Sequence, residues 1–231
     1  MLPARMQSLV DASTELATRF ADAGHTLYLV GGSVRDAIVG ATAGHEDHDL
    51  DFTTDARPDE IEAVVSGWAE AVWTQGKRFG TIGCLHGGRR LEITTHRAEA
   101  YVPDSRKPDV RFGDRVEDDL SRRDFTVNAM ALRLPDLELI DPFGGLSDLA
   151  ARRLRTPLDP VESFGDDPLR MLRAARFIAR LELEPDPDLV AAVVSGHHRL
   201  AIVSPERIRD ELDKILMVER PSVALWFVVR T

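Results

Sequence analysis

The sequence contains little cysteine and no long apolar run. One cysteine, Cys84, stands among 231 residues, which excludes a disulfide framework and favours a reducing compartment. No apolar stretch approaches the ~20 residues of a membrane-spanning helix, and residues 1–10 lack the charged, apolar and small-residue order of a secretory signal. We therefore expect a cytoplasmic protein with no membrane partner.

The chain also lacks a basic excess. Its 29 Lys and Arg residues against 39 Asp and Glu residues give a net charge of −10, which argues mildly against a nucleic-acid partner because phosphate-binding surfaces are usually basic. Arginines nevertheless gather in four short segments, 89–90, 122–123, 152–155 and 170–180. Clustered arginine on an acidic background fits a nucleotide site or a local RNA-contacting strip, and composition does not decide between them.

Apolar periodicity predicts an α/β front of about 140 residues and a helical rear. In the front it predicts helices at 6–23, at 33–40 and from 57 onward and strands at 25–30, 49–54, 69–75, 81–87 and 89–97. It also predicts two hairpins, one joining the last two strands at Gly87-Gly88 and one within 131–141. Residues 100–118 hold Pro, Gly and alternating charge, so we expect a loop there. Beyond about residue 143 every segment is predicted to be helical, with helices at 167–181, 186–196, 204–219 and 221–230.

The last segment, 223–231, is almost continuously apolar. A helix of this composition needs something to bury it, so either it packs back on the rear helices or the natural chain continues. We expect continuation.

The first segment that carries chemistry is a strand followed by Gly31-Gly32 and a helix. Glycine lets backbone N–H groups approach a phosphate closely, and the helix N-terminus adds partial positive charge. Arg35 follows one turn into the helix, where a guanidinium can grip two phosphate oxygens. A plain strand-to-helix turn is an equal alternative for this segment.

The second is Asp49-Leu50-Asp51. On a strand both carboxylates point to one face, about 7 Å apart, and can hold divalent cations between them. An acidic pair alone is more often an exposed strand face, but this pair follows the glycine turn by 17 residues, which favours a metal site. Glu92 lies on another predicted strand and is either a third carboxylate facing the pair or an exposed acid.

A competing metal motif, His45-Glu46-Asp47-His48, directly precedes the acidic pair. Histidine and carboxylate side chains are good zinc ligands. The segment lies in the predicted loop before the strand, however, and no further His-Asp cluster follows. We do not favour a histidine-based metal site.

Two later segments combine arginines with acids and amides. The segment 119–129, DLSRRDFTVNA, is suited to ribose hydroxyls and phosphates. In 166–177, DDPLRMLRAARF, Asp and Pro mark a helix start, and Arg170, Arg173 and Arg176 repeat along one side. Three like charges repel one another, so an anionic partner is favoured over a solvated basic face.

Together GGSVRD, DLDFTT, RRDFTVNAMA and DDPLRMLRAARF resemble, in order and spacing, the class II tRNA nucleotidyltransferase and bacterial poly(A) polymerase family. The later SPERIRDELDKIL resembles the next helix of that family, so the resemblance covers about residues 25–218. It implies an α+β fold: a polymerase-β-like catalytic head with a small mixed sheet over 1–142, then an all-helical neck over 143–231, truncated before the body and tail of relatives.

The resemblance also implies roles for individual residues. Asp49 and Asp51 would bind Mg²⁺. Glu92 is counted as a further candidate catalytic carboxylate because of its place on another predicted strand, not because of the resemblance. Nucleotide-binding positions would be Gly31, Gly32, Arg35, Arg122, Arg123, Asp124, Asn128, Asp167, Arg170, Arg173 and Arg176.

The resemblance also implies that Asp167 and Arg170 are the pair that recognises the incoming base, and this role can be checked from chemistry. A carboxylate accepts hydrogen bonds and a guanidinium donates them, which complements the amino donor and ring-nitrogen acceptor shared by cytosine and adenine. Uracil and guanine present the opposite pattern. The pair is therefore expected to select CTP and ATP without a template.

We expect a CCA-adding tRNA nucleotidyltransferase whose partners are the tRNA 3′ end, CTP and ATP. Ser33 leans toward CCA addition, because this position is often Ala in CCA-adding relatives and Gly in many poly(A) polymerases. The alternatives are a poly(A) polymerase, an enzyme that adds only CC or only A, and an inactive RNA-binding relative.

Overall fold

The computed structural model describes residues 4–40, 49–100 and 109–231. The chain forms two compact units. Unit 1 comprises residues 1–122 and 128–142, and unit 2 comprises residues 123–127 and 143–231. Five residues that lie within the predicted catalytic head, 1–142, thus belong to unit 2.

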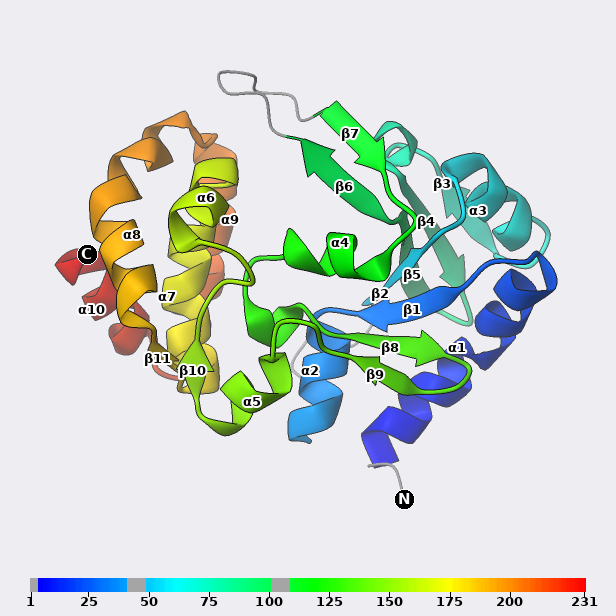
Figure 1. Ribbon diagram of the computed structural model, residues 1–231, viewed down its shortest axis with the longest axis horizontal. Helices are drawn as coiled ribbons and strands as arrows, with labels where there is room; N and C mark the ends of the chain where they lie inside the picture. Colours follow the sequence, from blue (N-terminus) through cyan, green and yellow to red (C-terminus); the bar gives the residue numbers. More distant parts are fainter. Residues whose placement is uncertain (1–3, 41–48, 101–108) are drawn as a thin grey trace. The chain divides into compact units, whose positions relative to one another are not determined.

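In the described part of the chain, unit 1 contains a seven-stranded sheet of order β3-β4-β5-β2-β1-β8-β9 (Figure 1). Its strands are β1 (Leu27–Val30), β2 (Asp49–Thr54), β3 (Ala71–Trp73), β4 (Thr81–His86), β5 (Arg89–Thr95), β8 (Ala131–Leu134) and β9 (Glu138–Ile140). The central strand β2 runs parallel to β5 and antiparallel to β1. The predicted small mixed sheet and the predicted hairpins at Gly87-Gly88 and within 131–141 are confirmed.

Helices cover the apolar face of this sheet. The helices of unit 1 are α1 (Ala4–Asp22), α2 (Gly32–Val39), α3 (Pro58–Val65) and α4 (Val116–Ser121). Leu50 and Phe52 of β2 are buried, as are Phe20 of α1 and Ile61 of α3, and Figure 1 shows α1 and α3 on the same side of the sheet. Because β2 alternates, the side chains of its odd-numbered residues are left for the opposite face.

The predicted loop at 100–118 is wrong for residues 100, 109–112 and 116–118 and is confirmed for 113–115. β6 (Arg97–Ala100) pairs antiparallel with β7 (Asp109–Phe112), and α4 begins after three further residues. Four-residue strands are too short to show apolar alternation, and the acids at 117–119 favour a helix start through the helix dipole. Residues 101–108 of this segment lie outside the described residues.

Unit 2 is built mainly from helices, α5 (Gly145–Ala150), α6 (Pro160–Asp166), α7 (Leu169–Leu181), α8 (Pro187–Gly196), α9 (Pro205–Leu216) and α10 (Pro221–Arg230). The predicted helices at 167–181, 186–196, 204–219 and 221–230 are confirmed. The prediction of an all-helical rear is wrong in one respect, because β10 (Arg153–Leu154) pairs in parallel with β11 (Glu184–Pro185). Strands of two residues leave no periodic signal in the sequence.

The helix starts of unit 2 follow a common chemistry. Asp159, Asp186 and Ser204 each accept a backbone N–H of the following helix, and proline occupies the first turn in α6, α8 and α9. α7 is the central helix, and its residues Met171 and Phe177 pack with Phe125 and Val127 from the inserted segment 123–127.

The apolar terminal segment forms α10 and packs on its own unit. Ala224 is buried, and Val223, Phe227 and Val228 lie against apolar side chains of α7 and α9. Trp226 and Val229 on the other side of α10 remain 59% and 75% exposed. No helix in the described ranges has the length and apolar character needed to cross a membrane.

Candidate active site

The acidic pair lies on the open face of the central strand. Asp49 and Asp51 are exposed, and Leu50 between them is buried. In the parallel pairing of β2 with β5, Asp51 lies opposite Glu92 and Asp49 lies opposite Arg90. The sheet therefore aligns three carboxylates and one guanidinium on the same face.

The charge environment of Glu92 reflects this arrangement. Partial burial raises the pKa of its carboxyl, and the nearby Asp51 and Asp49 carboxylates raise it further, whereas Arg90 opposes the shift. Carboxylates that perturb one another in this way are typical of sites that bind a cation or a proton.

The donor set fits magnesium. Mg²⁺ is usually bound by one or two carboxylates and keeps its remaining positions for water and substrate phosphates, which Asp49 and Asp51 allow. Among the residues that the structure describes, no three His, Cys, Asp or Glu side chains lie close enough together to hold a metal ion. The histidine-rich alternative at 45–48 lies outside the described residues.

The glycine turn lies level with the acidic pair. Leu29 of β1 pairs with Phe52 of the antiparallel β2, so the residues after Val30 lie beside the start of β2. Gly31 has a φ of 74°, a conformation that favours glycine, and Gly32 opens α2. The N-terminus of an eight-residue helix thus lies at the same sheet edge as the two aspartates.

Arg35 is enclosed in the structure. Its side chain is 3% exposed, its Nε donates to Asp36 Oδ1 at 2.7 Å, and its Nη1 donates to Asn128 Oδ1. A Cβ on Gly32 would lie 3.4 Å from the guanidinium, which is ordinary van der Waals contact. Arg35 thus forms a buried link between the start of α2 and Asn128, and its contact with a phosphate stays a prediction.

The segment 119–128 is divided between the two units. In unit 1, Arg122 Nη2 donates to the buried Asp119 at 3.1 Å. In unit 2, Asp124 accepts from the backbone N–H of Phe125 at 2.8 Å and from Arg173 Nε at 2.9 Å. Arg122 and Asn128 therefore belong to one unit, and Arg123 and Asp124 to the other.

The α7 arginines have partners within unit 2. Arg170 donates to Ser163 Oγ at 2.8 Å, Arg173 to Asp124, and Arg176 to Glu211 Oε1 at 2.5 Å. Carboxylates of the same chain neutralise Arg173 and Arg176, so the repulsion between like charges is relieved there without an external anion. The anionic partner of this row stays a prediction. Arg176 and Glu211 form a buried pair, with side chains 7% and 4% exposed.

Asp167 and Arg170 lie one turn apart at the start of α7. Asp167 Oδ1 accepts from the backbone N–H of Leu169 at 3.2 Å, and its Oδ2 accepts from Arg207 of α9 at 2.8 Å. Sequence reasoning missed the partners Ser163, Arg207 and Glu211. The last two stand in SPERIRDELDKIL, whose helix was predicted but whose polar residues had no assigned role.

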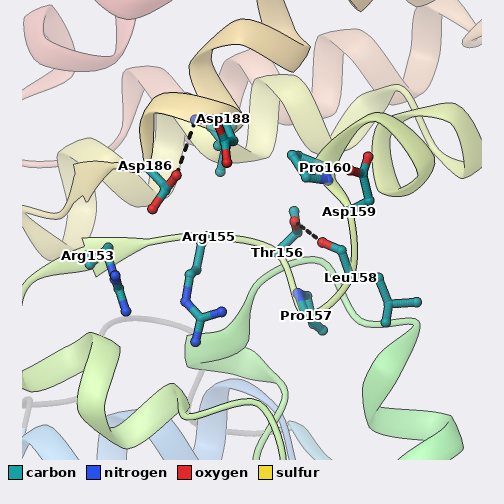
Figure 2. A pocket seen from close by; sticks show the side chains of 10 residues that line it. Arg153, Arg155, Thr156, Pro157, Leu158, Asp159, Pro160, Asp186 and Asp188 are labelled. Atoms are coloured by element: carbon teal, nitrogen blue, oxygen red, sulfur yellow. Dashed lines mark hydrogen bonds between the residues drawn. The ribbon is translucent and has the colours of Figure 1, made fainter.

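A separate pocket of about 480 Å³ lies within unit 2. Figure 2 shows Arg153 and Arg155 pointing away from Asp186, whose carboxylate caps α8. Both arginines bind the fully buried Asp148, Arg153 Nη2 at 2.7 Å and Arg155 Nε at 2.8 Å. The described lining of the pocket includes none of the predicted site residues. Its Arg153 and Arg155 are in ion pairs, and its Asp159 and Asp186 cap helices.

Comparison with known proteins shows which family the chain belongs to. Residues 27–155 match the family described as the Poly A polymerase head domain, which is more than half of the chain. The chain belongs to this family. A second match, described as a probable RNA- and SrmB-binding site of polymerase A, covers residues 182–226 of the chain. The family predicted from the four motifs is confirmed.

Relatives of this family member include CCA-adding enzymes. The chain is 42% identical over 203 residues to the CCA-adding enzyme of Bacillus licheniformis, a match that covers 87% of this chain and 49% of the relative. The structure of the Bacillus stearothermophilus CCA-adding enzyme in complex with CTP matches with a TM-score of 0.84 and 32% identity, over 99% of this chain and 52% of that one. The Thermotoga maritima enzyme complexed with tRNA matches with a TM-score of 0.77 and 30% identity, over 96% and 50%. The predicted polymerase-β-like fold is confirmed, and the chain spans about half the length of these relatives.

Proposed function

We propose that the protein adds C and A from CTP and ATP to the 3′ end of tRNA, without a template and with release of pyrophosphate. The observation that carries the proposal is the exposed pair Asp49 and Asp51, level with the glycine turn and in register with Glu92. Relatives that are CCA-adding enzymes, solved with CTP and with tRNA, support the choice of reaction and substrates. A tRNA substrate makes the cytoplasm the compartment in which we propose that it acts.

In this proposal residues 1–142 form the catalytic head and residues 143–231 form the neck. Asp49 and Asp51 would hold Mg²⁺, with Glu92 as the third carboxylate. When bound, Mg²⁺ supplies positive charge that activates the 3′-hydroxyl and stabilises the pyrophosphate leaving group. The strand fixes the direction of both carboxylates, so their contribution is positioning and charge.

The phosphates of the incoming nucleotide are held at the glycine turn, by backbone N–H groups of Gly31 and Gly32 at the start of α2. Arg35 acts as a positioning residue that holds Asn128 beside this turn. Arg122 and Arg123 contribute charge to the phosphates and sugar.

Unit 2 recognises the base. Asp167 accepts from the amino group of cytosine or adenine, and Arg170 donates to the adjacent ring nitrogen. Arg173 orients Asp124, which binds the sugar, and Arg176 supports α7 through its bond to Glu211. Cytosine and adenine present a hydrogen-bond donor beside an acceptor, which matches this pair, whereas uracil and guanine present the reverse and are rejected.

The test is incorporation of each labelled nucleotide by the purified chain into tRNA that lacks its terminal CCA. We expect CTP and ATP to be used in the presence of Mg²⁺, UTP and GTP to be rejected, and incorporation to stop after CCA. Long tails of A alone would identify a poly(A) polymerase instead, and incorporation of only CC or only A would identify a partial enzyme.

A matched set of variants tests the acidic pair. Asp49→Asn and Asp51→Asn should each lower the transfer rate about 100-fold or more, because metal-ion stabilisation of the transition state is worth several kcal/mol. Asp136→Asn, an exposed acid in the turn between β8 and β9, should retain the wild-type rate. Unchanged transfer in both β2 variants, with native circular dichroism, would remove the proposed metal role.

A further inference from the structure

A pocket of about 520 Å³ lies in unit 1 beside the acidic pair. Its lining includes Trp73, Phe79, Thr81, Gly83, Arg90 and Glu92. Glu92 belongs both to this pocket and to the group of three carboxylates on the open face of the sheet. The volume is that of a pocket for a small molecule or for part of a polymer.

The strand register connects the pocket to the acidic pair in a straight row. Asp51 lies opposite Glu92, Glu92 opposite Gly83, and Gly83 opposite Trp73. Neighbouring strands are about 4.8 Å apart, so the row spans roughly 14 Å from Asp51 to Trp73. Gly83 has no side chain to fill the row, and a Cβ there would lie 3.3 Å from the Trp73 ring.

Two aromatic rings at the pocket each carry an arginine. The Arg90 guanidinium lies 5.5 Å from the centroid of the Trp73 ring, and that of Arg78 lies 4.4 Å from the centroid of Phe79. Phe79 is 41% exposed, and Trp73 is partly buried. Solvent-accessible rings beside arginines are the combination with which proteins stack unpaired bases and contact the phosphates between them.

The direction of the proposed reaction assigns the two sides of β2 to different substrates. The glycine turn that holds the phosphates of the incoming nucleotide follows β1, on one side of β2. The aromatic pocket lies across β5, β4 and β3, on the other side. Attacking and leaving oxygens are roughly in line in phosphoryl transfer, so the strand with the attacking hydroxyl approaches from the side opposite the leaving group.

We infer that this pocket holds the unpaired 3′-terminal bases of the acceptor RNA, stacked on Trp73 and Phe79 with Arg90 and Arg78 at the backbone. The inference rests on the proposed function and names the binding site of its second substrate. Stacking tolerates every base because every base has a π-face. Such a site suits a terminus whose last base changes as C and A are added.

RNA binding by the whole chain, measured without nucleotide, tests the inference. The probe is a fluorescein-labelled single-stranded oligoribonucleotide with the sequence of a tRNA acceptor strand that lacks CCA. Its binding is measured by fluorescence anisotropy. Trp73→Ala and Phe79→Ala should each raise the Kd for this RNA about 5- to 30-fold, the loss of one stacked base. Trp73→Phe keeps a ring and should stay within about threefold of wild type.

Two controls make the result specific. The KM for CTP should be unchanged in the alanine variants, because the pocket lies away from the glycine turn. Arg133→Gln removes an arginine from β8, several strands from the pocket, and should leave the Kd for RNA unchanged, whereas Arg90→Gln should raise it.

An unchanged Kd for RNA in both alanine variants, with wild-type melting temperatures, overturns the inference. A raised KM for CTP with an unchanged Kd for RNA also overturns it, because the pocket would then bind the incoming base. If Trp73→Ala unfolds, Phe79→Ala decides, since Phe79 lies in an exposed turn. If the chain binds RNA through these rings but transfers no nucleotide, only the proposed function is refuted. If it transfers nucleotides and the variants keep the wild-type affinity for RNA, only the inference that the pocket binds RNA is refuted.

Discussion

At the scale of single residues, the face of β2 that carries the acidic pair becomes buried toward the end of the strand. Thr53 follows Asp51 on the same face of β2 and is buried, and its Oγ1 lies 2.8 Å from Nδ1 of His96. His96 is 1% exposed, and the ring of Tyr28 lies 5.6 Å from it. Burial lowers the pKa of His96 below its ordinary value of 6.5, against the opposing effect of Asp119 and other acids. The folded protein therefore holds this histidine neutral.

Acid should destabilise the protein through His96. In the unfolded chain His96 takes up a proton near pH 6.5, whereas in the folded chain its lowered pKa delays protonation, so stability is lost as pH falls from about 6.5 toward the folded pKa. We expect the melting temperature of His96→Gln to fall less between pH 7 and pH 5 than that of the wild type. His198→Gln, an exposed histidine, is the control, and equal slopes for wild type and His96→Gln would contradict the prediction.

At the scale of elements, one buried ion pair joins two helices of unit 2. Arg176 of α7 and Glu211 of α9 meet at 2.5 Å with almost no solvent access, and the Arg176 guanidinium also lies 4.6 Å from the Phe177 ring. Charges removed from water repay their desolvation only when both partners are present. The pair is therefore a strict requirement for the packing of α9 on α7 rather than a large source of stability.

Removing one partner should cost more than removing both. Glu211→Ala leaves Arg176 buried without its carboxylate and should lower the free energy of unfolding by about 3–5 kcal/mol, measured by urea denaturation. The double variant Arg176→Met with Glu211→Leu should lie much closer to wild type. If the double variant is as unstable as the single one, packing rather than charge explains the effect.

Sequence patterns predicted elements well where chemistry is local. The segment 27–54 was predicted as strand, glycine turn, helix and strand because alternation, Gly31-Gly32 and Gly40 each act within a few residues. The surroundings of Arg35 and Arg176 were not predictable, because their partners Asn128 and Glu211 lie 93 and 35 residues away. The aromatic pocket was missed for the same reason, since its rings and arginines come from 73–90 and only the strand register brings them beside Glu92.

At the scale of the whole molecule, the charge of the chain opposes the partner that we propose. A net charge of −10 repels RNA, so binding depends on local cations such as Arg78 and Arg90 beside the rings of the aromatic pocket. The net electrostatic potential of the chain therefore does not attract RNA over long distances. The match of residues 182–226 to a family with probable RNA-binding function indicates where further contacts can be sought.

RNA affinity should therefore depend only moderately on salt. About three phosphate contacts to single-stranded RNA give a slope of roughly −2 for the logarithm of the association constant against the logarithm of salt concentration. Anisotropy titrations with the acceptor-strand oligonucleotide over a series of KCl concentrations measure this slope. A slope steeper than about −5 would indicate a broad basic surface that the charge distribution does not provide.

The path of the chain between the two units limits how the protein can be divided by genetic engineering. Because residues 123–127 belong to unit 2, the backbone crosses from one unit to the other after residues 122, 127 and 142. A gene fragment that encodes only residues 143–231 lacks Phe125 and Val127, two fully buried side chains of the unit 2 core. Chimaeras that exchange residues 143–231 between relatives must therefore also carry residues 123–127, although 15 residues of unit 1 separate the two segments in the sequence.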